Sequence, residues 1–403
     1  MPQQQTARRP TGGQGAGRPR SFLVGTQDVL EGGDYNQSMT SASAGIPGGS
    51  LTPWQLQATG WLARLWFVVS WTSTGGTGVQ ADGPFNIIGT IQLNDVNNEA
   101  IFGPFNGYVW FVVVKYGGYY FSDDPSTAPT YNPTATAGQF ILQIPLEIVS
   151  RDPIGPIASV NNTASLTVLL SLNTFATAFT GTFTASSVTV TGTQEFYWEP
   201  RKTDKQGRAI AGAPPASGTT QYWTQGSVTF SGAGTFNQQL ITGLGYPFRE
   251  YIFILYDVAA GTRAAGETDW PNPLVGLKFE ANFLLTQYKK TEWQGEIGRC
   301  TGYDSPAFDT RSTSAAWTPP GKENGVYPLF FNKDFFLKKN GGETRRTYLV
   351  TSPGSNFIIN GAFGGSSGSI LYSIVNYVAP GGGGGAGNAQ ARHQDTAMLT
   401  GGQ

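Results

Sequence analysis

One break in composition divides the sequence into two halves of similar length. Over residues 188–198, valines and a glycine alternate with threonines and an aromatic triplet closes the run, which is the period-two pattern of a β-strand. Residues 200–220 then carry charges, Gly, Ala, Ser and the pair Pro214–Pro215, with hardly any large apolar side chain. Such a segment buries too little surface to fold alone, so we interpret it as a linker.

The composition favours short strands and many contacts with partners. The chain has 403 residues, which suffices for two domains of ordinary size. Charged residues make up 13%, about half the usual share, while Gly and Pro number 55 and 25. This mixture suits strands joined by turns and a surface that is covered by other proteins. The formal net charge of −1 gives the body of the protein no electrostatic reason to bind nucleic acid.

Neither a disulfide nor a membrane helix is expected. Cys300 is the only cysteine, so no intrachain disulfide can form, which fits assembly in a reducing cytoplasm. The first residues lack the apolar core of a signal peptide. The longest apolar runs, such as 109–114, fall far short of the roughly 20 residues that a membrane helix needs.

The first half reads as all-β, with no long helix. Gly75, Gly76 and Gly78 are expected to end its first strand, and Pro145 indicates a bulge or a sheet edge. Residues 117–138 read as a long loop. The predicted strands of this half are 61–71, 85–94, 107–116, 140–149, 164–175 and 187–198.

The second half also reads as all-β. Residues 227–232 and 236–242 are expected to pair as a hairpin, and 289–324 reads as a long irregular stretch. The remaining predicted strands are 249–258, 273–288, 325–331, 346–351, 355–361 and 369–378.

The two halves repeat one order of elements. Each has an early apolar strand, then a strand with an internal glycine at Gly89 or Gly276, then a strand interrupted by Pro145 or Pro328. The spacing is typical of a sandwich or jelly roll, so we predict an all-β chain of two tandem jelly rolls. Two unrelated β domains remain the alternative. The predicted division is an N-terminal arm over 1–50, a first jelly roll over 51–199, a linker over 200–220, a second jelly roll over 221–380 and a flexible Gly-rich tail over 381–403.

Few motifs in the sequence indicate a catalytic or metal-binding site. The pattern G-x-S-x-G occurs at 364–368, but a hydrolase needs it between a strand and a helix with a histidine in reach, and His393 lies in the tail. One Cys and one His cannot make a zinc cluster. Asp123 and Asp124 could bind calcium, although adjacent acids in a loop are usually just solvated.

Paired carboxylates of the glycosidase kind stay open, because their spatial pairing is invisible in a sequence. Glu147, Glu195 and Glu280 lie in predicted strands, where alternation alone explains an outward-facing acid. The frequent aromatic residues could form a platform for carbohydrate or bases, but core and subunit interfaces are the more ordinary place for them. We therefore expect no catalytic residue, no cofactor and no metal site.

The N-terminal arm carries a small basic cluster. Arg8, Arg9, Arg18 and Arg20 precede the first acid, Asp28. They belong either to a solvated tail or to an arm that orders on a neighbouring subunit, an anionic membrane surface or packaged nucleic acid. Four charges do not decide among these partners.

Two segments carry a resemblance to a known family. FILQIPLEIVSRDPIGPIASVNNTASLTVLLSLNTF with the nearby SVTVTGTQEFYW, within 140–198, is similar to late strands of that family's first barrel. ENGVYPLFFNKDFF, at 323–336, resembles a segment of its second barrel. The family is that of the double jelly-roll major capsid proteins of tailless icosahedral double-stranded DNA viruses with an internal membrane, tectivirus-like bacteriophages in particular. By layout the resemblance spans roughly residues 50–380.

The resemblance implies a structural role without enzymatic activity. Three chains would form a pseudo-hexagonal homotrimer that tiles an icosahedral shell, with both barrels upright and the loops 117–138 and 289–324 in outer towers. The arm would point inward, its four arginines towards an anionic membrane leaflet, where each is worth about 1 kcal/mol. Further implied partners are minor capsid, penton and membrane proteins of the virion, with no sequence-specific binding of nucleic acid. Assembly would take place in the host cytoplasm.

Three other classes of protein remain. A carbohydrate-binding spike or adhesin would bind a glycan and would not tile. A β-sandwich glycosidase or lyase would need two acids that converge in a cleft. A single jelly-roll capsid protein with a projecting second domain is disfavoured by the matching layout of the halves.

Overall fold

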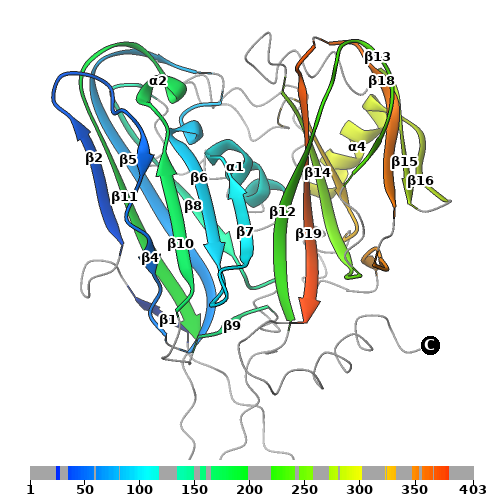
Figure 1. Ribbon diagram of the computed structural model, residues 1–403, viewed down its shortest axis with the longest axis horizontal. Coiled ribbons are helices and arrows are strands. Elements are labelled where there is room, and N and C mark those ends of the chain that lie inside the picture. The colour runs from blue at the N-terminus through cyan, green and yellow to red at the C-terminus, as the bar shows by residue number, and fades with distance from the viewer. Residues whose placement is uncertain are drawn as a thin grey trace, which may run out of the picture.

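The computed structural model describes most of both halves of the chain, and the structural statements below concern the residues that it describes. These are 24–27, 35–58, 60–80, 82–117, 134–148, 155–159, 165–197, 219–240, 245–256, 272–279, 282–301, 323, 325–332, 347–353, 356–365 and 367–380. Strands dominate and form three sheets (Figure 1).

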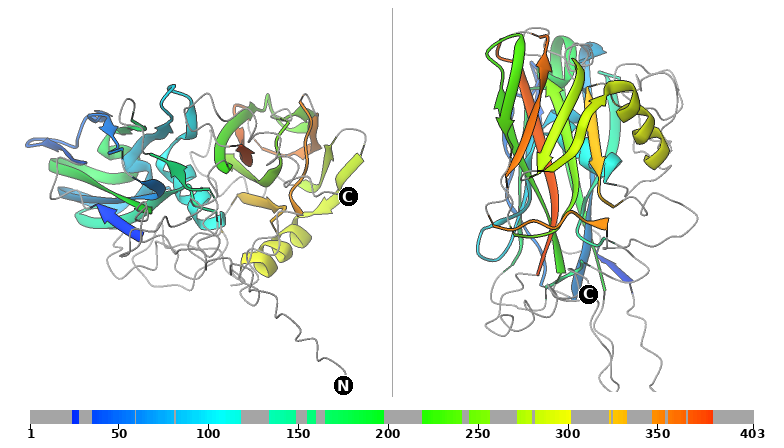
Figure 2. Two further views of the ribbon diagram at one scale, coloured as in Figure 1. Left: turned by 90° about the horizontal axis from the view of Figure 1, so that it is seen from below. Right: turned by 90° about the vertical axis from the view of Figure 1, so that its right-hand side faces the viewer.

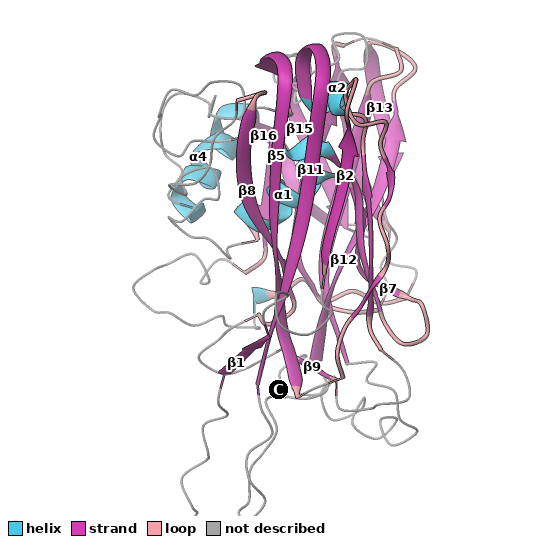
Figure 3. Cartoon of the chain, turned by 90° about the vertical axis from the view of Figure 1, so that its left-hand side faces the viewer, coloured by secondary structure: helices cyan, strands magenta, loops and turns pink. Residues whose placement is uncertain are grey.

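The first sheet has six strands, all from the first half of the sequence. Its order is β1 (Val24–Gln27), β11 (Phe179–Tyr197), β5 (Trp61–Val79) and β8 (Ala137–Pro145), with β2 (Asn36–Ser41) also paired to β11 and β9 (Ile157–Ala158) to β5. Figure 3 shows the long strands β5 and β11 running the height of this face.

The second sheet has nine strands and draws on both halves of the sequence. Its order is β17 (Val326–Phe330), β14 (Phe248–Tyr256), β19 (Ile370–Pro380), β12 (Thr219–Thr229), β7 (Ala100–Phe105), β6 (Ile88–Asn94), β10 (Thr167–Leu172) and β3 (Gly49–Ser50), with β4 (Trp54–Gln55) on β10.

The third sheet and the helices complete the described elements. The sheet has the order β13 (Gly234–Gln239), β18 (Phe357–Phe363), β15 (Asn272–Phe279) and β16 (Asn282–Lys289). The helices are η1 (Phe85–Ile87), α1 (Gly107–Tyr116), α2 (Phe175–Ala178) and α4 (Lys290–Thr301).

One pairing scheme occurs twice along the chain. In the first half, β11 pairs with β2 and β5, β5 with β8, β10 with β6, and β6 with β7. In the second half, β19 pairs with β12 and β14, β14 with β17, β18 with β15, and β15 with β16. The prediction of two tandem jelly rolls is therefore confirmed. We call β1–β11 with α1 and α2 the first roll, and β12–β19 with α4 the second roll.

The two rolls stand side by side and share a sheet. Strand β7 of the first roll pairs in parallel with β12 of the second roll, with Phe102 opposite Trp223. The strands of both rolls run along one common direction (Figure 1), and the view from below shows two adjacent groups of strands (Figure 2).

The first strand of the first roll is longer than the sequence predicts. Apolar residues from Leu65 to Trp71 alternate towards the core, as expected, but β5 then continues to Val79. Gly75 adopts a φ of +89°, and a Cβ there would lie 2.0 Å from the carbonyl oxygen of Thr182. The glycines therefore let the backbones of β5 and β11 approach closely where their register shifts, and they do not end the strand.

The predicted strand over residues 107–116 is wrong, because this segment is the helix α1. Asn106 caps it by accepting a hydrogen bond from the backbone N–H of Val109 at 2.8 Å. All ten residues are buried, so apolar side chains are needed on every side of the helix and no helical period appears in the sequence. Packing between the two rolls thus overrides the β preference of valine and aromatic residues.

Three smaller predictions are also corrected. Strands β12 and β13 pair with β19 and β18, so 227–232 and 236–242 do not form a hairpin with each other. In the described part of the predicted strand 346–351, residues 347–351, the only β pairing is an isolated bridge between Leu349 and Phe248. The stretch 289–324, read as irregular, contains α4.

The structure describes some of the remaining predicted features, while others lie outside the described residues. Pro145 ends β8, an edge strand, as the proline indicates. Strands β1 and β2, within the expected arm, pair with β11. The four arginines of the arm, most of the predicted linker over 200–220, the tail, the two loop aspartates and Glu280 lie outside the described residues. Among the described helices, none is long and apolar enough to cross a membrane.

Candidate functional site at the joint between the two rolls

Helix α1 of the first roll carries a buried cation that meets an anion of the second roll. Lys115 Nζ lies 2.6 Å from Glu323 Oε1, and their side chains are 0% and 3% exposed. The Tyr108 hydroxyl donates to Glu323 Oε2 at 3.0 Å, and the Tyr116 hydroxyl accepts from the Glu323 backbone N–H at 2.8 Å. Three side chains of α1 therefore hold one residue that lies just before β17.

This ion pair contributes more to the relative position of the two rolls than to the free energy of unfolding. A buried pair gains little over apolar side chains of the same shape, but losing one partner leaves an uncompensated charge in the interior. Any movement of the second roll away from α1 would separate Lys115 from Glu323. The pair therefore penalises arrangements of the rolls in which Lys115 and Glu323 are apart.

A second buried cation, from the second roll, meets the end of the same helix. Arg249 in β14 is fully buried, and its Nη1 and Nη2 donate to the carbonyl oxygen of Gly117 at 3.4 and 3.3 Å. Nη1 also donates to Asn376 Oδ1 at 3.2 Å. Gly117 is the C-cap of α1, where the helix dipole and the unpaired carbonyls favour a cation.

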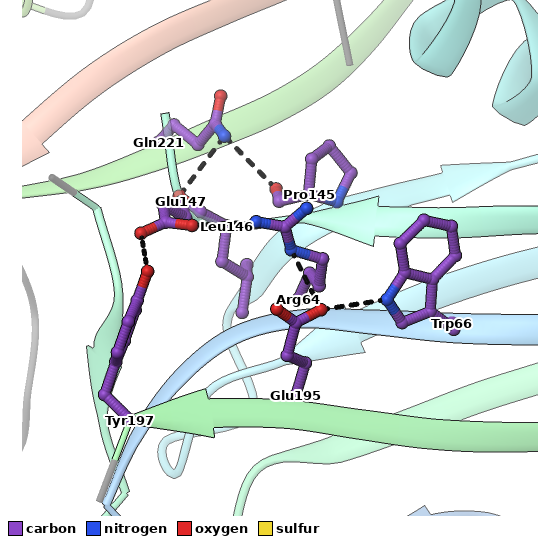
Figure 4. Close-up of polar contacts among 8 residues, drawn as sticks. All are labelled: Arg64, Trp66, Pro145, Leu146, Glu147, Glu195, Tyr197 and Gln221. Atoms are coloured by element: carbon purple, nitrogen blue, oxygen red, sulfur yellow. Dashed lines mark hydrogen bonds and ion pairs between the residues drawn. The ribbon is translucent and has the colours of Figure 1, made fainter. Parts of the chain in front are cut away.

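A third contact holds the backbone beyond the edge strand β8. Gln221 in β12 donates from Nε2 to the carbonyl oxygens of Pro145 and Leu146 at 3.3 and 3.2 Å, as Figure 4 shows. Asn376 Nδ2 in turn donates to Gln221 Oε1 at 3.2 Å. The first roll is thus bonded to the second at α1, at β7 and beyond β8.

Two of the candidate acids meet beside this contact. Arg64 Nη2 lies 2.8 Å from Glu147 Oε2, and Arg64 Nε lies 3.3 Å from Glu195 Oε2 (Figure 4). Trp66 Nε1 donates to Glu195 Oε2 at 3.1 Å, and the Tyr197 hydroxyl donates to Glu147 Oε1. Burial, and then the bond to Glu147, raises the pKa of the Tyr197 phenol.

Their surroundings give these acids a structural role. Glu195 lies in β11 as predicted, but Glu147 follows the end of β8 and is buried, so the expectation of an outward-facing strand residue is wrong for it. Arg64 contacts both carboxylates, and Trp66 and Tyr197 also donate hydrogen bonds to them, so the described contacts of these acids are those of a structural network. The sequence could not show that Arg64, Glu147 and Glu195 come together.

The other motifs also fit a structural reading. The G-x-S-x-G segment at 364–368 connects strands β18 and β19, so the strand-to-helix turn of a nucleophile is not formed there. Cys300 is buried in α4, with its Sγ 3.6 Å from Glu296 Oε1. Within the described ranges, no group of three or more His, Cys, Asp or Glu side chains is placed to hold a metal ion.

Each roll contains the same contact between a tryptophan and an edge strand. Trp110 of α1 donates from Nε1 to the carbonyl oxygen of Gln143 in β8 at 2.8 Å, and its ring meets Phe67 edge-on at 5.2 Å. Trp293 of α4 donates to the carbonyl oxygen of Pro328 in β17 at 2.7 Å, and its ring meets Phe253 edge-on at 5.9 Å.

The strand registers around these two contacts agree as well. Gln143 pairs with Trp66, the residue before Phe67. Pro328 pairs with Ile252, the residue before Phe253. Helices α1 and α4 are therefore equivalent elements of the two rolls, a relation that the sequence analysis missed by reading 107–116 as a strand. The two tryptophans, each ahead of a proline-containing strand, are the sequence signal that could have revealed it.

Comparisons with known proteins identify the fold. No protein-family model matches the sequence, and no curated protein matches it either. Among solved structures, the crystal structure of the STIV major capsid protein is similar, with a TM-score of 0.52 and 13% identity over 88% of this chain and 96% of that one. The atomic structure of Sulfolobus turreted icosahedral virus gives a TM-score of 0.56 and 10% identity over 94% and 96%. The chain thus has the double jelly-roll fold of these capsid proteins.

Proposed function

We propose that this chain is a major capsid protein, whose work is to present two jelly rolls in one fixed relation as a building block of a virus shell. The observation that carries the proposal is the joint. Buried ionic and polar contacts fix the two rolls of one chain side by side, with their strands along one direction. The likeness in fold to capsid proteins supports the same role.

The finer form of the proposal concerns assembly. Three chains, each with two similar rolls, form a pseudo-hexagonal trimer of six lobes, and such trimers tile an icosahedral shell. The shell encloses an internal membrane and a double-stranded DNA genome, and Arg8, Arg9, Arg18 and Arg20 of the arm face that membrane. Minor capsid, penton and membrane proteins of the virion complete the set of partners. The predicted division into arm, first roll, linker, second roll and tail is part of this proposal, with the arm shortened to the residues before β1, because β1 and β2 pair with β11.

The competing functions gain no support from a particular observation. A glycan-binding spike would use exposed aromatic rings, whereas among the described residues Tyr246 is the one large aromatic side chain that is exposed. A glycosidase would use two free acids, whereas Glu147 and Glu195 share Arg64.

The native mass of the purified protein tests the proposal. Light scattering after gel filtration is expected to give about 129 kDa, the mass of three chains of 43.0 kDa. Electron microscopy of that species should then show six-lobed particles. A stable monomer at high protein concentration would contradict the trimer, and glycan binding by that monomer would favour the spike.

A further inference from the structure

One face of strand β12 belongs to the joint between the rolls. Residues that stand opposite each other in an antiparallel pair share a face, and Trp223 of β12 stands opposite Asn376 of β19. Gln221 and Gln225 lie on the same face as Trp223, because side chains alternate along a strand. The first roll covers this face, since Gln221 donates to two backbone carbonyl oxygens beyond β8.

Two polar atoms on this face have no hydrogen-bond partner among the described residues. They are Nε1 of Trp223 and Oε1 of Gln225, and both atoms are buried. Trp223 is 1% exposed, so its indole N–H is removed from bulk water. A buried donor or acceptor without a partner destabilises the fold, and native proteins contain few of them. Both atoms therefore call for a partner that is not a side chain of the described part of the protein.

The chemistry of the two atoms defines that partner. The indole N–H can only donate a hydrogen bond, and the amide oxygen can only accept one. The N–H disfavours a metal cation, and the oxygen disfavours an anion. A small neutral molecule that accepts one hydrogen bond and donates another satisfies both atoms, and water is the smallest such molecule.

The spacing of the two residues suits a single bridging molecule. Residues that are two positions apart on a strand have Cα atoms about 7 Å apart, and their side chains project from the same face. Two consecutive hydrogen bonds through one water join atoms that are up to about 6 Å apart. Side chains as long as Trp223 and Gln225 can therefore share one water without leaving the strand geometry.

The ladder between the rolls ends beside these two residues. Strands β7 and β12 run parallel, and within the described ranges the one residue pair that joins them is Phe102 with Trp223. Two residues further along, Pro104 stands at the level of Gln225, and proline has no backbone N–H to donate. Pro104 is exposed and Gln225 is half-buried, so bulk water has access to this end of the joint.

We propose that the joint binds a water molecule that accepts a hydrogen bond from Trp223 Nε1 and donates one to Gln225 Oε1. Buried waters make about three hydrogen bonds, so this water has capacity for a further bond to the first roll. It extends the contact between the rolls past the point where the pairing of β7 with β12 stops. The inference rests on the geometry of the joint and holds whether or not the chain builds a virus shell.

A density map of the full-length protein tests the site directly. A crystal structure or electron-microscopy map that resolves ordered water should show a peak about 2.7–3.2 Å from both Trp223 Nε1 and Gln225 Oε1. A direct bond between the two side chains, with no peak between them, would overturn the proposal. In Gln225→Met the peak should be lost, because a thioether is a weak acceptor. A peak that persists in this variant would show that Gln225 does not hold the water.

A double-variant cycle gives a second readout in solution. Gln225→Met leaves the indole N–H without the bridge and should raise the equilibrium constant of unfolding about tenfold. Trp223→Phe removes the donor. The double variant should lose less stability than the two single variants together, because the water contributes nothing once either partner is gone. Strictly additive losses would contradict a shared water.

Thr229→Val supplies the matched control for the cycle. Thr229 lies on the same strand and the same face as Trp223, but it is exposed and far along the strand. Its effect should add to that of Trp223→Phe. Coupling as strong as that of Gln225→Met would trace the effect to the whole strand and overturn the assignment of the bridge to Gln225. Circular dichroism of every variant establishes that the fold is retained.

Discussion

At the scale of single residues, the joint depends on a few buried polar groups whose partners lie far away in the sequence. Lys115 and Glu323 are 208 positions apart, and Arg249 and Gly117 are 132 apart. Each charge is hydrogen-bonded, which is the condition under which charges are tolerated in a protein interior. Their spacing explains why no local pattern in the sequence points to the joint.

The ion pair of α1 should show strong coupling. Lys115→Met leaves the Glu323 carboxylate buried without its cation, so the free energy of unfolding should fall by about 3–5 kcal/mol. The double variant Lys115→Met/Glu323→Leu should cost less than the sum of the two single changes. Urea unfolding of all four proteins measures the coupling.

The exposed pair of α4 supplies the control for that cycle. Arg299 has a side chain that is 60% exposed, and its bond to Glu296 joins neighbouring turns of one helix. Arg299→Met should therefore change the free energy of unfolding by at most about 1 kcal/mol. Additive effects of the Lys115 and Glu323 changes would argue against a shared buried contact.

Buried phenols should make the fold sensitive to alkali. Burial raises the pKa above its ordinary value near 10 for several tyrosines, among them Tyr35, Tyr251 and Tyr377. Above pH 10 the unfolded chain therefore binds fewer protons than the folded one. Stability is fully present below pH 10 and falls as the pH rises further. Chemical unfolding at a series of pH values between 8 and 11 measures this slope.

Tyr35 offers a clean variant for that measurement. Its hydroxyl is buried and has no hydrogen-bond partner among the described residues, so Tyr35→Phe should retain or raise the stability at pH 7. The same change should also reduce the slope of the free energy of unfolding against pH above pH 10, because one fewer proton is released on unfolding. A slope unaltered by the substitution would show that this phenol titrates alike in both states.

At the scale of elements, the fold follows from patterns that survive in sequence, except where the two rolls cover each other. The sequence predicts the apolar strand β14, the strands β6 and β15 with their internal glycines, and the strands that contain the edge prolines. Helix α1 could not be predicted, because all ten of its residues are buried and its sequence lacks the periodic polar positions that distinguish a helix from a strand. The pairing of β7 with β12 was equally hidden, since a single residue pair leaves no periodic signal.

The recurring tryptophan contact predicts equal effects in the two rolls. Trp110→Phe and Trp293→Phe each leave a buried carbonyl, of Gln143 or Pro328, without its donor. Each change should lower the free energy of unfolding by about 1–3 kcal/mol. Trp66→Phe serves as the control, because its partner Glu195 is half-buried and water can replace the lost bond at smaller cost. Thermal and urea unfolding of the three variants provide the comparison.

At the scale of the whole molecule, two copies of one roll are joined through surfaces that differ from each other. Among the described strands, β16 pairs only with β15 and β2 pairs only with β11, whereas β7 and β12 pair with each other across the joint. The order of elements in the sequence predicts the double roll, and this prediction is confirmed. The joint could not be predicted, because its contacts join residues that lie far apart in the sequence.

The shared sheet also has a consequence for biosynthesis. The first roll leaves the ribosome complete before β12 exists, and domains generally fold in that order. During this interval the edge of β7 has no partner, and the apolar side of α1 that the second roll will cover faces water. An unpaired strand edge beside exposed valines is a template for aggregation. We therefore expect the nascent first roll to be more prone to aggregation than the complete chain.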